Sequence, residues 1–276
     1  MTESQVDRWQ RLLEEWAIPS ELLDAVPDSP YGWSRALWKR RAQVAHERGS
    51  ETPTSDIIRS LLPAQGSLLD VGAGTGRASL VHGVDGHQLT AVEKNPELAD
   101  GFRQQATELG VAAQLVEGVW PEVAEVVDVH DVAMCAHVVY DVQDIKPFVA
   151  ELSRHARTGV VVELTPDHPW SGFAPYYRAL HGLERPDGPT YREFVAVVEE
   201  VDGARPEVEV WIRPGQVWFE SWEEILDHYG KRLVLPRHRW EELRELLDPE
   251  VEKDSGRLYV GSRERTIVTV WWRSGA

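Results

Sequence analysis

Leu68-Leu69-Asp70-Val71-Gly72-Ala73-Gly74-Thr75-Gly76-Arg77 carries the strongest structural signal in the chain. An apolar strand is expected to lead into this segment and a helix to follow it, which is the setting of a ligand-binding turn. Glycines at 72, 74 and 76 let the backbone bend tightly and approach a ligand without an intervening Cβ. The segment therefore predicts a binding turn at the carboxyl end of a strand.

Two common nucleotide motifs do not fit this turn. A dinucleotide fingerprint needs the spacing G-x-G-x-x-G, and no glycine occupies its last position. A P-loop needs Gly-Lys followed by Ser or Thr, and that tripeptide is absent from the sequence. The pattern present is Asp-x-Gly-x-Gly-x-Gly, in which Asp70 would attract a cationic ligand more readily than a pyrophosphate.

A second carboxylate supports the same site. The apolar segment QLTAVE reads as the next strand and ends at Glu93, 23 residues beyond Asp70. A carboxylate at that position can accept hydrogen bonds from both hydroxyls of a ribose, as it does in enzymes that bind NAD. Asp70 and Glu93 together predict a ligand that carries a cation and a ribose.

Strands and helices alternate along the middle of the chain. Further apolar segments predict strands at 112–116, 131–136 and 159–164, with helices from Asn95 to Gly110 and over 145–156. Such alternation predicts a parallel, doubly wound α/β sheet with ligands at the carboxyl ends of its strands. The segments EVEVWIR (207–213) and TIVTVWW (266–272) predict two more strands.

The glycine segment and Glu93 resemble the first motifs of class I S-adenosylmethionine (SAM)-dependent methyltransferases, and the resemblance extends over 67–164. It implies a Rossmann-like, seven-stranded, mostly parallel sheet with an antiparallel last strand. Residues 131–152 are similar to the fourth strand and following loop of small-molecule methyltransferases. Residues 219–236 and the Trp-Trp ending are similar to actinobacterial methyltransferases of unassigned substrate.

The resemblance implies SAM as cofactor and places its binding residues on four loops. In the family the glycine turn holds the methionine part of SAM, so Asp70 would orient the ammonium group. LVEGVWPEV (115–123) is similar to the third motif, but Val119 stands where an acid usually meets adenine, so Glu117 or a backbone carbonyl would replace it. The expected cofactor-binding residues are Asp70, Gly72, Ala73, Gly74, Gly76, Glu93, Lys94, Gly118, Val119, Trp120, Ala136 and His137.

Methyl transfer needs a base only when the acceptor must lose a proton. His137 follows the fourth strand and has an ordinary pKa near neutrality, so it is a candidate base, although a purely structural ring is also open. Tyr140 and Asp141 lie on the same loop and are the other catalytic candidates. Asp167 and His168 have no metal-site spacing with His137, and no metal site is predicted.

Aromatic residues predict a covered substrate pocket. Tyr31 and Trp33 precede a helix, and Trp170 and Tyr176 lie in an insertion after the fifth strand. Both regions are expected to cover the acceptor, with simple packing of a cap on the sheet as the alternative. The predicted organisation is a helical N-terminal cap over 1–64 and a methyltransferase domain over 65–276 with an insertion at about 165–206.

The composition argues against several partners. The formal net charge of −17 repels phosphate backbones, and the basic cluster at Arg35, Lys39, Arg40 and Arg41 reads as a solvated helix face. No apolar run is long enough to span a membrane. The opening residues show no export signal and the single cysteine, Cys135, cannot form an internal disulfide, so a cytoplasmic protein is expected.

The leading hypothesis is methyl transfer from SAM to O, N or C of a small molecule. One alternative is an RNA- or ribosome-associated methyltransferase, because residues 161–173 resemble part of a mitoribosome-linked family, although that family's cysteine cluster is missing. Another is a SAM-binding module without catalysis, supported only by the missing acid at Val119. The oligomeric state is left open.

Overall fold

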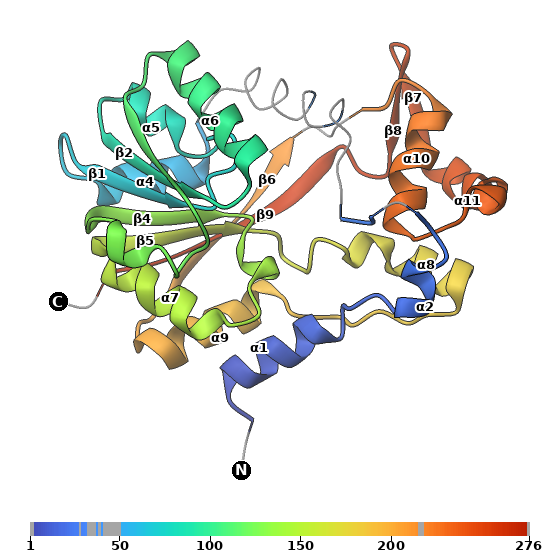
Figure 1. Cartoon of the computed structure of the whole chain (residues 1–276), viewed down its shortest axis with the longest axis horizontal. Coiled ribbons are helices and arrows are strands. Elements are labelled where there is room, and N and C mark those ends of the chain that lie inside the picture. The colour runs from blue at the N-terminus through green and yellow to red at the C-terminus, as the bar shows by residue number, and fades with distance from the viewer. Residues whose placement is uncertain are drawn as a thin grey trace.

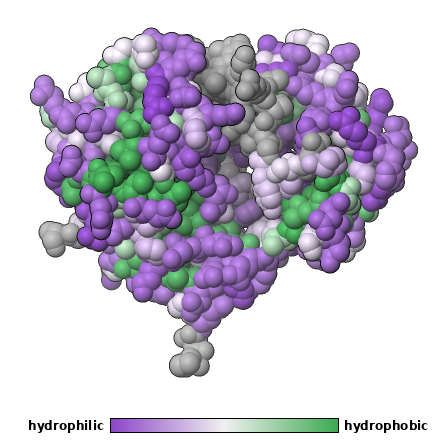
Figure 2. Space-filling model, viewed as in Figure 1, coloured by the Kyte–Doolittle hydropathy of each residue, from purple (hydrophilic) through white to green (hydrophobic). Residues whose placement is uncertain are grey.

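The structure is a computed structural model that describes residues 3–27, 29–31, 37, 40, 51–214 and 218–274. Figure 1 shows two lobes, a larger one built on the central sheet and a smaller one on the opposite side of the molecule. The segments β9 and β6 run from the large lobe toward the small one. Figure 2 shows that hydrophilic side chains cover most of this face, with apolar side chains gathered in a patch on each lobe.

The large lobe contains a seven-stranded sheet in the order β3-β2-β1-β4-β5-β9-β6. The pairs β1–β2, β1–β4, β2–β3 and β4–β5 are parallel, whereas β9 is antiparallel to both β5 and β6. The predicted fold class is therefore confirmed. The strands are β1 (Ser67–Val71), β2 (Gln88–Glu93), β3 (Ala113–Glu117), β4 (His130–Ala136), β5 (Ala156–Leu164), β6 (Glu207–Pro214) and β9 (Glu264–Trp272).

Helices cover both faces of this sheet, because successive strand residues point to opposite sides. One face packs against α4 (Pro53–Leu61), α5 (Leu80–Val84) and α6 (Pro96–Leu109), and the other against α1 (Gln5–Glu14), α7 (Ile145–Arg154) and α9 (Tyr191–Asp202). In β1, for example, Leu68 belongs to the first core and Leu69 to the second. Asn95 caps α6 as predicted, and Gly110 ends it in a left-handed conformation.

The small lobe, called the cap below, has its own hydrophobic core. It gathers α2 (Ser20–Leu23), Leu37, α8 (Ala174–His181), α10 (Trp222–Arg232), α11 (Trp240–Leu247) and the hairpin of β7 (Val251–Asp254) and β8 (Arg257–Val260). Short 3-10 turns complete the chain: η1 (Ala124–Val126), η2 (Val139–Asp141), η3 (Ser171–Phe173), η4 (Arg237–Arg239) and η5 (Asp248–Glu250).

The cap is assembled differently from the expectation. The helices α1 and α4 of the N-terminal region, and α9 of the expected insertion, pack on the sheet. The larger part of the cap comes instead from the segment between β6 and β9. The apolar stripes of these helices are equally suited to either partner, so sequence alone does not say which core receives them.

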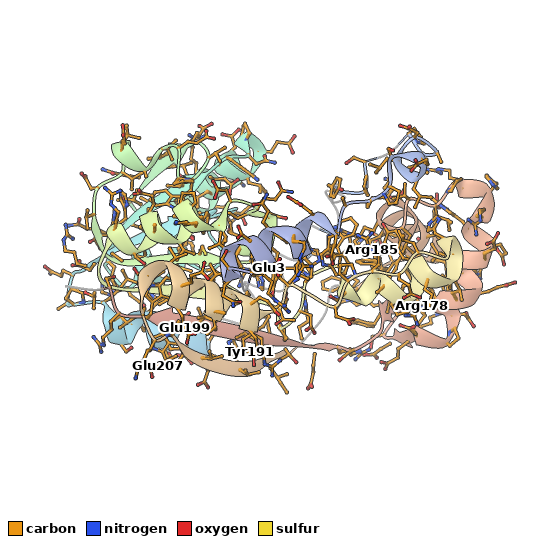
Figure 3. All side chains as sticks on the ribbon, turned by 90° about the horizontal axis from the view of Figure 1, so that it is seen from below. Glu3, Arg178, Arg185, Tyr191, Glu199 and Glu207 are labelled. Atoms are coloured by element: carbon orange, nitrogen blue, oxygen red, sulfur yellow. The ribbon has the colours of Figure 1, made fainter. Side chains whose placement is uncertain are left out.

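Arg185 ties the cap to the chain that enters it. Its guanidinium donates hydrogen bonds to the carbonyls of Trp16 and Ala17 and lies 4.9 Å from the ring centres of both Trp16 and Tyr177. Figure 3, seen from below, places Arg185 and Arg178 on the cap side and Tyr191, Glu199 and Glu207 on the sheet side. Arg185 thus fixes the segment between α1, which packs on the sheet, and α2, which belongs to the cap.

Candidate functional site

The glycine turn leaves β1 at the carboxyl edge and is held against β2. Gly72 and Ala73 both donate backbone hydrogen bonds to the carbonyl of Val92, at 2.8 and 3.1 Å. Gly72 and Gly74 have φ angles of +71° and +57°, which side chains other than glycine rarely adopt. A Cβ on Gly72 would lie 2.5 Å from Val138, whereas a Cβ on Gly74 would meet nothing within 4 Å. The turn therefore packs tightly at Gly72 and opens at Gly74.

Asp70 lies beneath this turn and is 1% exposed. Neither carboxylate oxygen accepts a hydrogen bond of normal geometry from the part of the chain that is described. Burial raises the pKa of Asp70 to about 6, and the nearby Ser79 hydroxyl and Arg77 charge oppose that rise. A buried carboxylate without a hydrogen-bond partner is costly unless a ligand supplies one.

Glu93 faces the same turn from the end of β2. One of its carboxylate oxygens accepts a hydrogen bond from the Gly74 amide and the other from the Asn95 amide, both at 2.8 Å. Each oxygen keeps a further lone pair, so Glu93 is fixed in orientation and can still accept from two hydroxyl groups. This is the geometry expected of a ribose-binding carboxylate.

The residues expected to contact adenine differ in their exposure and in their contacts. Val119 is 44% exposed, and Gly118 donates its backbone hydrogen bond to the Glu93 carbonyl at 3.1 Å. Trp120 is buried in the core, where its indole N–H donates to the Phe148 carbonyl at 3.3 Å. Of the two roles open to Trp120, contact with the adenine ring and packing in the core, these contacts fit the second. Lys94 is exposed beside Glu93.

His137 directly follows β4, and the next residue, Val138, lies against Gly72 of the glycine turn. It has a φ of +60°, unusual for a residue with a side chain, and its backbone N–H donates to the Glu163 carbonyl at 2.7 Å. Its Nε2 lies 3.2 Å from a carboxylate oxygen of Glu163. Burial lowers the pKa of His137 to about 4, so the ring is neutral at pH 7. With Nε2–H donated to Glu163, the Nδ1 lone pair is left to accept a proton.

Glu163 is the centre of a charged cluster that sequence reasoning did not single out. One of its carboxylate oxygens accepts from Arg77 at 2.8 Å and from Arg213 at 2.6 Å, and the other accepts from the Thr54 hydroxyl at 2.9 Å. These positive neighbours hold its pKa well below the ordinary value even though it is 2% exposed. The sequence feature that could have indicated this cluster is the acidic residue within the apolar segment GVVVEL (159–164).

The two other catalytic candidates differ in their surroundings. Tyr140 is buried, its ring stacks on Trp9 with centres 5.7 Å apart, and its hydroxyl donates to the Thr165 carbonyl at 2.8 Å. These contacts fit a packing role for Tyr140, and its catalytic role stays a prediction. Asp141 is exposed at the end of η2, and the positive charge of Lys94 acts on it.

The structure brings together only part of the expected aromatic pocket. Tyr31, which is 62% exposed, and Trp170 have ring centres 5.5 Å apart. Tyr176 is buried in the cap core, where its ring lies 6.1 Å from that of Tyr229. Trp33 lies outside the described residues. Tyr31 and Trp170 remain candidates for contact with the acceptor, whereas Tyr176 stabilises the cap.

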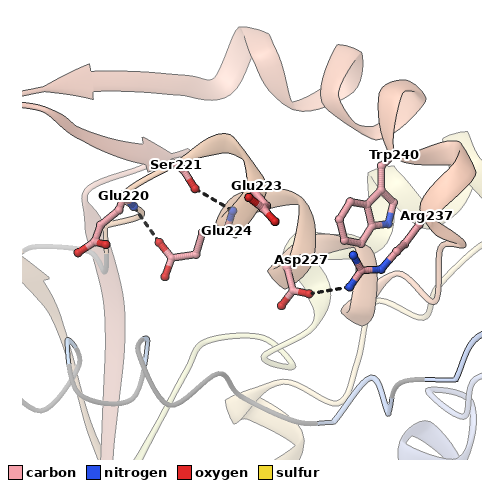
Figure 4. Close-up of a pocket in the computed structure, with 7 residues that line it drawn as sticks. All are labelled: Glu220, Ser221, Glu223, Glu224, Asp227, Arg237 and Trp240. Carbon is pink, nitrogen blue, oxygen red and sulfur yellow. Dashed lines mark hydrogen bonds and ion pairs between the residues drawn. The ribbon is translucent and has the colours of Figure 1, made fainter.

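A separate pocket of about 320 Å³ lies on the cap (Figure 4). Its lining is mainly acidic, but three of the four carboxylates already have partners: Glu220 and Glu224 pair with Arg40 at 3.2 and 2.8 Å, and Asp227 pairs with Lys231 at 2.8 Å. We therefore assign it no ligand. Across the described ranges, no group of three or more His, Cys, Asp or Glu side chains is placed to hold a metal ion.

Comparison with known proteins identifies a family for the part of the chain that forms this edge of the sheet. Residues 69–163 match the family described as a methyltransferase domain. The matched residues run from β1 to β5 and include Asp70, Glu93 and His137. This chain contains a class I SAM-dependent methyltransferase domain. The methyltransferase domain confirms the superfamily, the enzyme class and the cofactor that the sequence predicts.

Solved structures support the fold of the methyltransferase domain. A protein from Bacillus halodurans proposed to be a methyltransferase is 13% identical, with a TM-score of 0.55 over 82% of this chain and 100% of that one. The YcgJ protein from Bacillus subtilis is 17% identical, with a TM-score of 0.51 over 81% and 98%. Magnesium protoporphyrin IX methyltransferase from Synechocystis is 10% identical, with a TM-score of 0.51 over 87% and 88%. No curated protein matches the sequence.

The residues present fit SAM at the glycine turn. The buried Asp70 carboxylate lacks a hydrogen-bond donor, which the ammonium group of SAM would supply. The free space at Gly74 admits a ligand against the backbone, and Glu93 is oriented beside it.

In the described part of the chain, no helix is long and apolar enough to cross a bilayer.

Proposed function

We propose that the protein transfers the methyl group of SAM to a small-molecule acceptor held between the carboxyl edge of the sheet and the cap. The observation that carries this proposal is the buried Asp70 carboxylate beneath the glycine turn, which lacks a hydrogen bond of normal geometry, with His137 directly after the neighbouring strand β4. We further propose that Asp70 holds the ammonium group, Glu93 the ribose, and the backbone from Gly72 to Gly76 the methionine part.

The proposed chemistry is a direct displacement. SAM supplies a methyl group on a positively charged sulfur, and the carbon–sulfur bond breaks as the acceptor's lone pair forms its bond to that carbon. The protein contributes mainly by placing the acceptor in line with the methyl group and excluding water. A hydroxyl or amine acceptor must also lose a proton, and a neutral His137 held by Glu163 accepts it at Nδ1.

The charge of the whole chain supports a small acceptor over a nucleic acid. The formal net charge is −17, and the Glu163 cluster is a local positive region within that field. Nucleic-acid binding gains most of its affinity from many phosphate contacts along an extended basic surface. A single cluster of arginines suits one anionic group instead.

Calorimetric titration of the purified protein tests the cofactor. We expect micromolar binding of SAM and of its demethylated product, S-adenosylhomocysteine, and none of NAD. Binding of NAD alone, or of none of the three, would contradict the proposal.

The proposed base is tested by His137→Asn with any acceptor that loses a proton. We expect the affinity for SAM to stay within about twofold and kcat to fall by about 10²–10⁴, the range of general base catalysis. The matched control is His181→Asn, since His181 lies in the cap and its Nε2 donates a hydrogen bond to the Leu233 carbonyl, away from the sheet edge. An unchanged kcat in His137→Asn would remove the base from the mechanism.

A further inference from the structure

The strands β6 and β9 continue as a ribbon past the carboxyl edge of the parallel sheet. Glu163 at the end of β5 pairs with Thr269 of β9, and Thr269 pairs with Glu209 of β6. Four residues farther along the ribbon, Arg213 pairs directly with Arg265. Paired residues of an antiparallel ribbon point to the same side. The two guanidinium groups therefore leave the same face of the ribbon beside the proposed methyl-transfer site.

This arrangement of like charges needs compensation. Like charges directly opposite each other in a sheet destabilise it. Glu163 compensates Arg213 at 2.6 Å, but the same carboxylate oxygen also accepts from Arg77 at 2.8 Å. None of the described residues forms a hydrogen bond or ion pair with the Arg265 side chain. Three guanidinium groups thus share one carboxylate, and the cluster keeps an excess of positive charge.

The electrostatic consequence is visible at Arg213. Its side chain is 19% exposed, and burial lowers its pKa. Glu163 opposes that change, while the charges of Arg77 and Arg265 add to it. Arg77, Arg213 and Arg265 therefore repel one another, and an anion placed among them would relieve the repulsion.

The Arg213 guanidinium is also held in place. It lies 4.9 Å from the ring centre of Trp211, and the indole N–H of Trp211 donates to the Thr269 hydroxyl at 3.1 Å. Guanidinium groups present parallel N–H donors that match the two oxygens of a carboxylate or phosphate. The pair Arg213 and Arg265 is thus suited to bind one such group.

The position of the pair points to the acceptor. Arg213 Nη1 lies 3.5 Å from His137 Nε2, so the cluster adjoins the proposed base. Arg77 directly follows the glycine turn and can serve the carboxylate of SAM. Arg213 and Arg265 come from the other half of the sheet, on β6 and β9.

We propose that Arg213 and Arg265 bind an anionic group, a carboxylate or a phosphate, on the methyl acceptor. The inference rests on the proposed function, because it assigns an acceptor class to the same site. It adds that acceptors carrying such a group bind better than neutral molecules of the same shape.

The test compares matched probes on the protein saturated with S-adenosylhomocysteine. Calorimetry measures the binding of 4-hydroxybenzoate, 4-hydroxyphenyl phosphate and the neutral 4-hydroxybenzamide. We expect at least one anion to bind tenfold or more tightly than the amide, and the tighter anion identifies carboxylate or phosphate as the preferred group. Arg265→Gln and Arg213→Gln should remove this preference, and Arg265→Lys should keep most of it.

The controls separate the inference from its basis. Arg157→Gln alters an arginine at the other end of β5, beside Asp131, and should leave the preference for the anion intact. If S-adenosylhomocysteine binds but no anion binds better than the amide, or if Arg265→Gln keeps the preference, this inference is overturned and the proposed function stands. If S-adenosylhomocysteine itself does not bind, the proposed function fails.

Discussion

The two halves of the sheet edge carry similar carboxylates in opposite surroundings. Asp70 at the end of β1 is 1% exposed and Glu163 at the end of β5 is 2% exposed. Neither oxygen of Asp70 accepts a hydrogen bond of normal geometry from the described residues, and burial raises its pKa to about 6 against the opposing effect of the nearby Ser79 hydroxyl. Glu163 is surrounded by Arg77, Arg213, His137 and Thr54, and its pKa is held far below the ordinary value.

Burial alone therefore does not determine the role of a carboxylate. The half around Asp70 and Glu93 is short of positive charge and suits a cationic cofactor. The half around Glu163 has a surplus of positive charge and suits an anionic acceptor. We therefore propose that this edge of the sheet offers complementary sites for the two reactants, with His137 between them.

The largest expected effect is on the Glu163 side. Glu163→Ala leaves Arg77 and Arg213 without their shared partner, and removing one member of a buried ion pair typically costs about 3–5 kcal/mol. We expect a loss of that order in the free energy of unfolding, measured in urea. Glu184→Ala, which removes an exposed partner of Arg178, is the control and should change little. If both variants lost the same free energy of unfolding, the buried cluster would contribute no more to stability than an exposed ion pair.

The pH dependence of stability sharpens the contrast at Asp70. Its pKa is about 6 in the folded protein and near the ordinary value of 3.8 when unfolded, so the folded state binds the proton more tightly. Stability without ligand should therefore fall as pH rises from about 4 to about 6, by about 3 kcal/mol at 1.36 kcal/mol per pKa unit. Asp70→Asn should abolish this part of the dependence. A stability that rises steadily through that range would contradict the unpartnered state of Asp70.

Cofactor binding should respond to Asp70 in the opposite sense. Asp70→Asn removes the charge proposed to hold the ammonium group, and hydrogen bonds to charged groups contribute about 1.5–3 kcal/mol. We expect SAM affinity to fall by about 10- to 100-fold by calorimetry, while the unliganded protein becomes no less stable at pH 7. Asp100→Asn, on the exposed side of α6, is the control and should bind SAM normally. Unchanged affinity in Asp70→Asn would move the cofactor elsewhere.

The smallest expected effect concerns the glycine turn. Gly74→Ala and Gly110→Ala place a Cβ at similar φ angles, +57° and +68°, with nothing within 4 Å in either case. Both should lose about 1 kcal/mol of stability from backbone strain. Only Gly74→Ala should also weaken SAM, because its Cβ enters the space proposed for the cofactor. If the two variants bind SAM equally, the open space at Gly74 is not part of the site.

Much of the cofactor half could be predicted from the sequence. Asp70, the glycines and Glu93 belong to one short strand-turn-helix unit and the strand that follows it, so their positions are set by local backbone geometry and by strand order. The strand at 207–213 and the strand at 266–272 were also predictable, since alternating β-branched and aromatic residues favour strands. The roles of Trp120 and Tyr140 were harder to predict, because an aromatic residue near the end of a strand can pack in a core as well as contact a ligand.

The acceptor half was decided by the tertiary structure. Glu163 is 86 residues from Arg77 and 50 from Arg213 in the sequence. The pairing of β1, β4 and β5 brings Arg77 to Glu163, and the pairing of β5, β9 and β6 brings Arg213 there. The cap likewise draws on segments before β1, after β5 and between β6 and β9. The sequence alone was enough to predict the turn that we propose binds the cofactor, because that turn is a local structure. Charge neutralisation between distant strands depends on register, which the chain acquires only when the sheet forms.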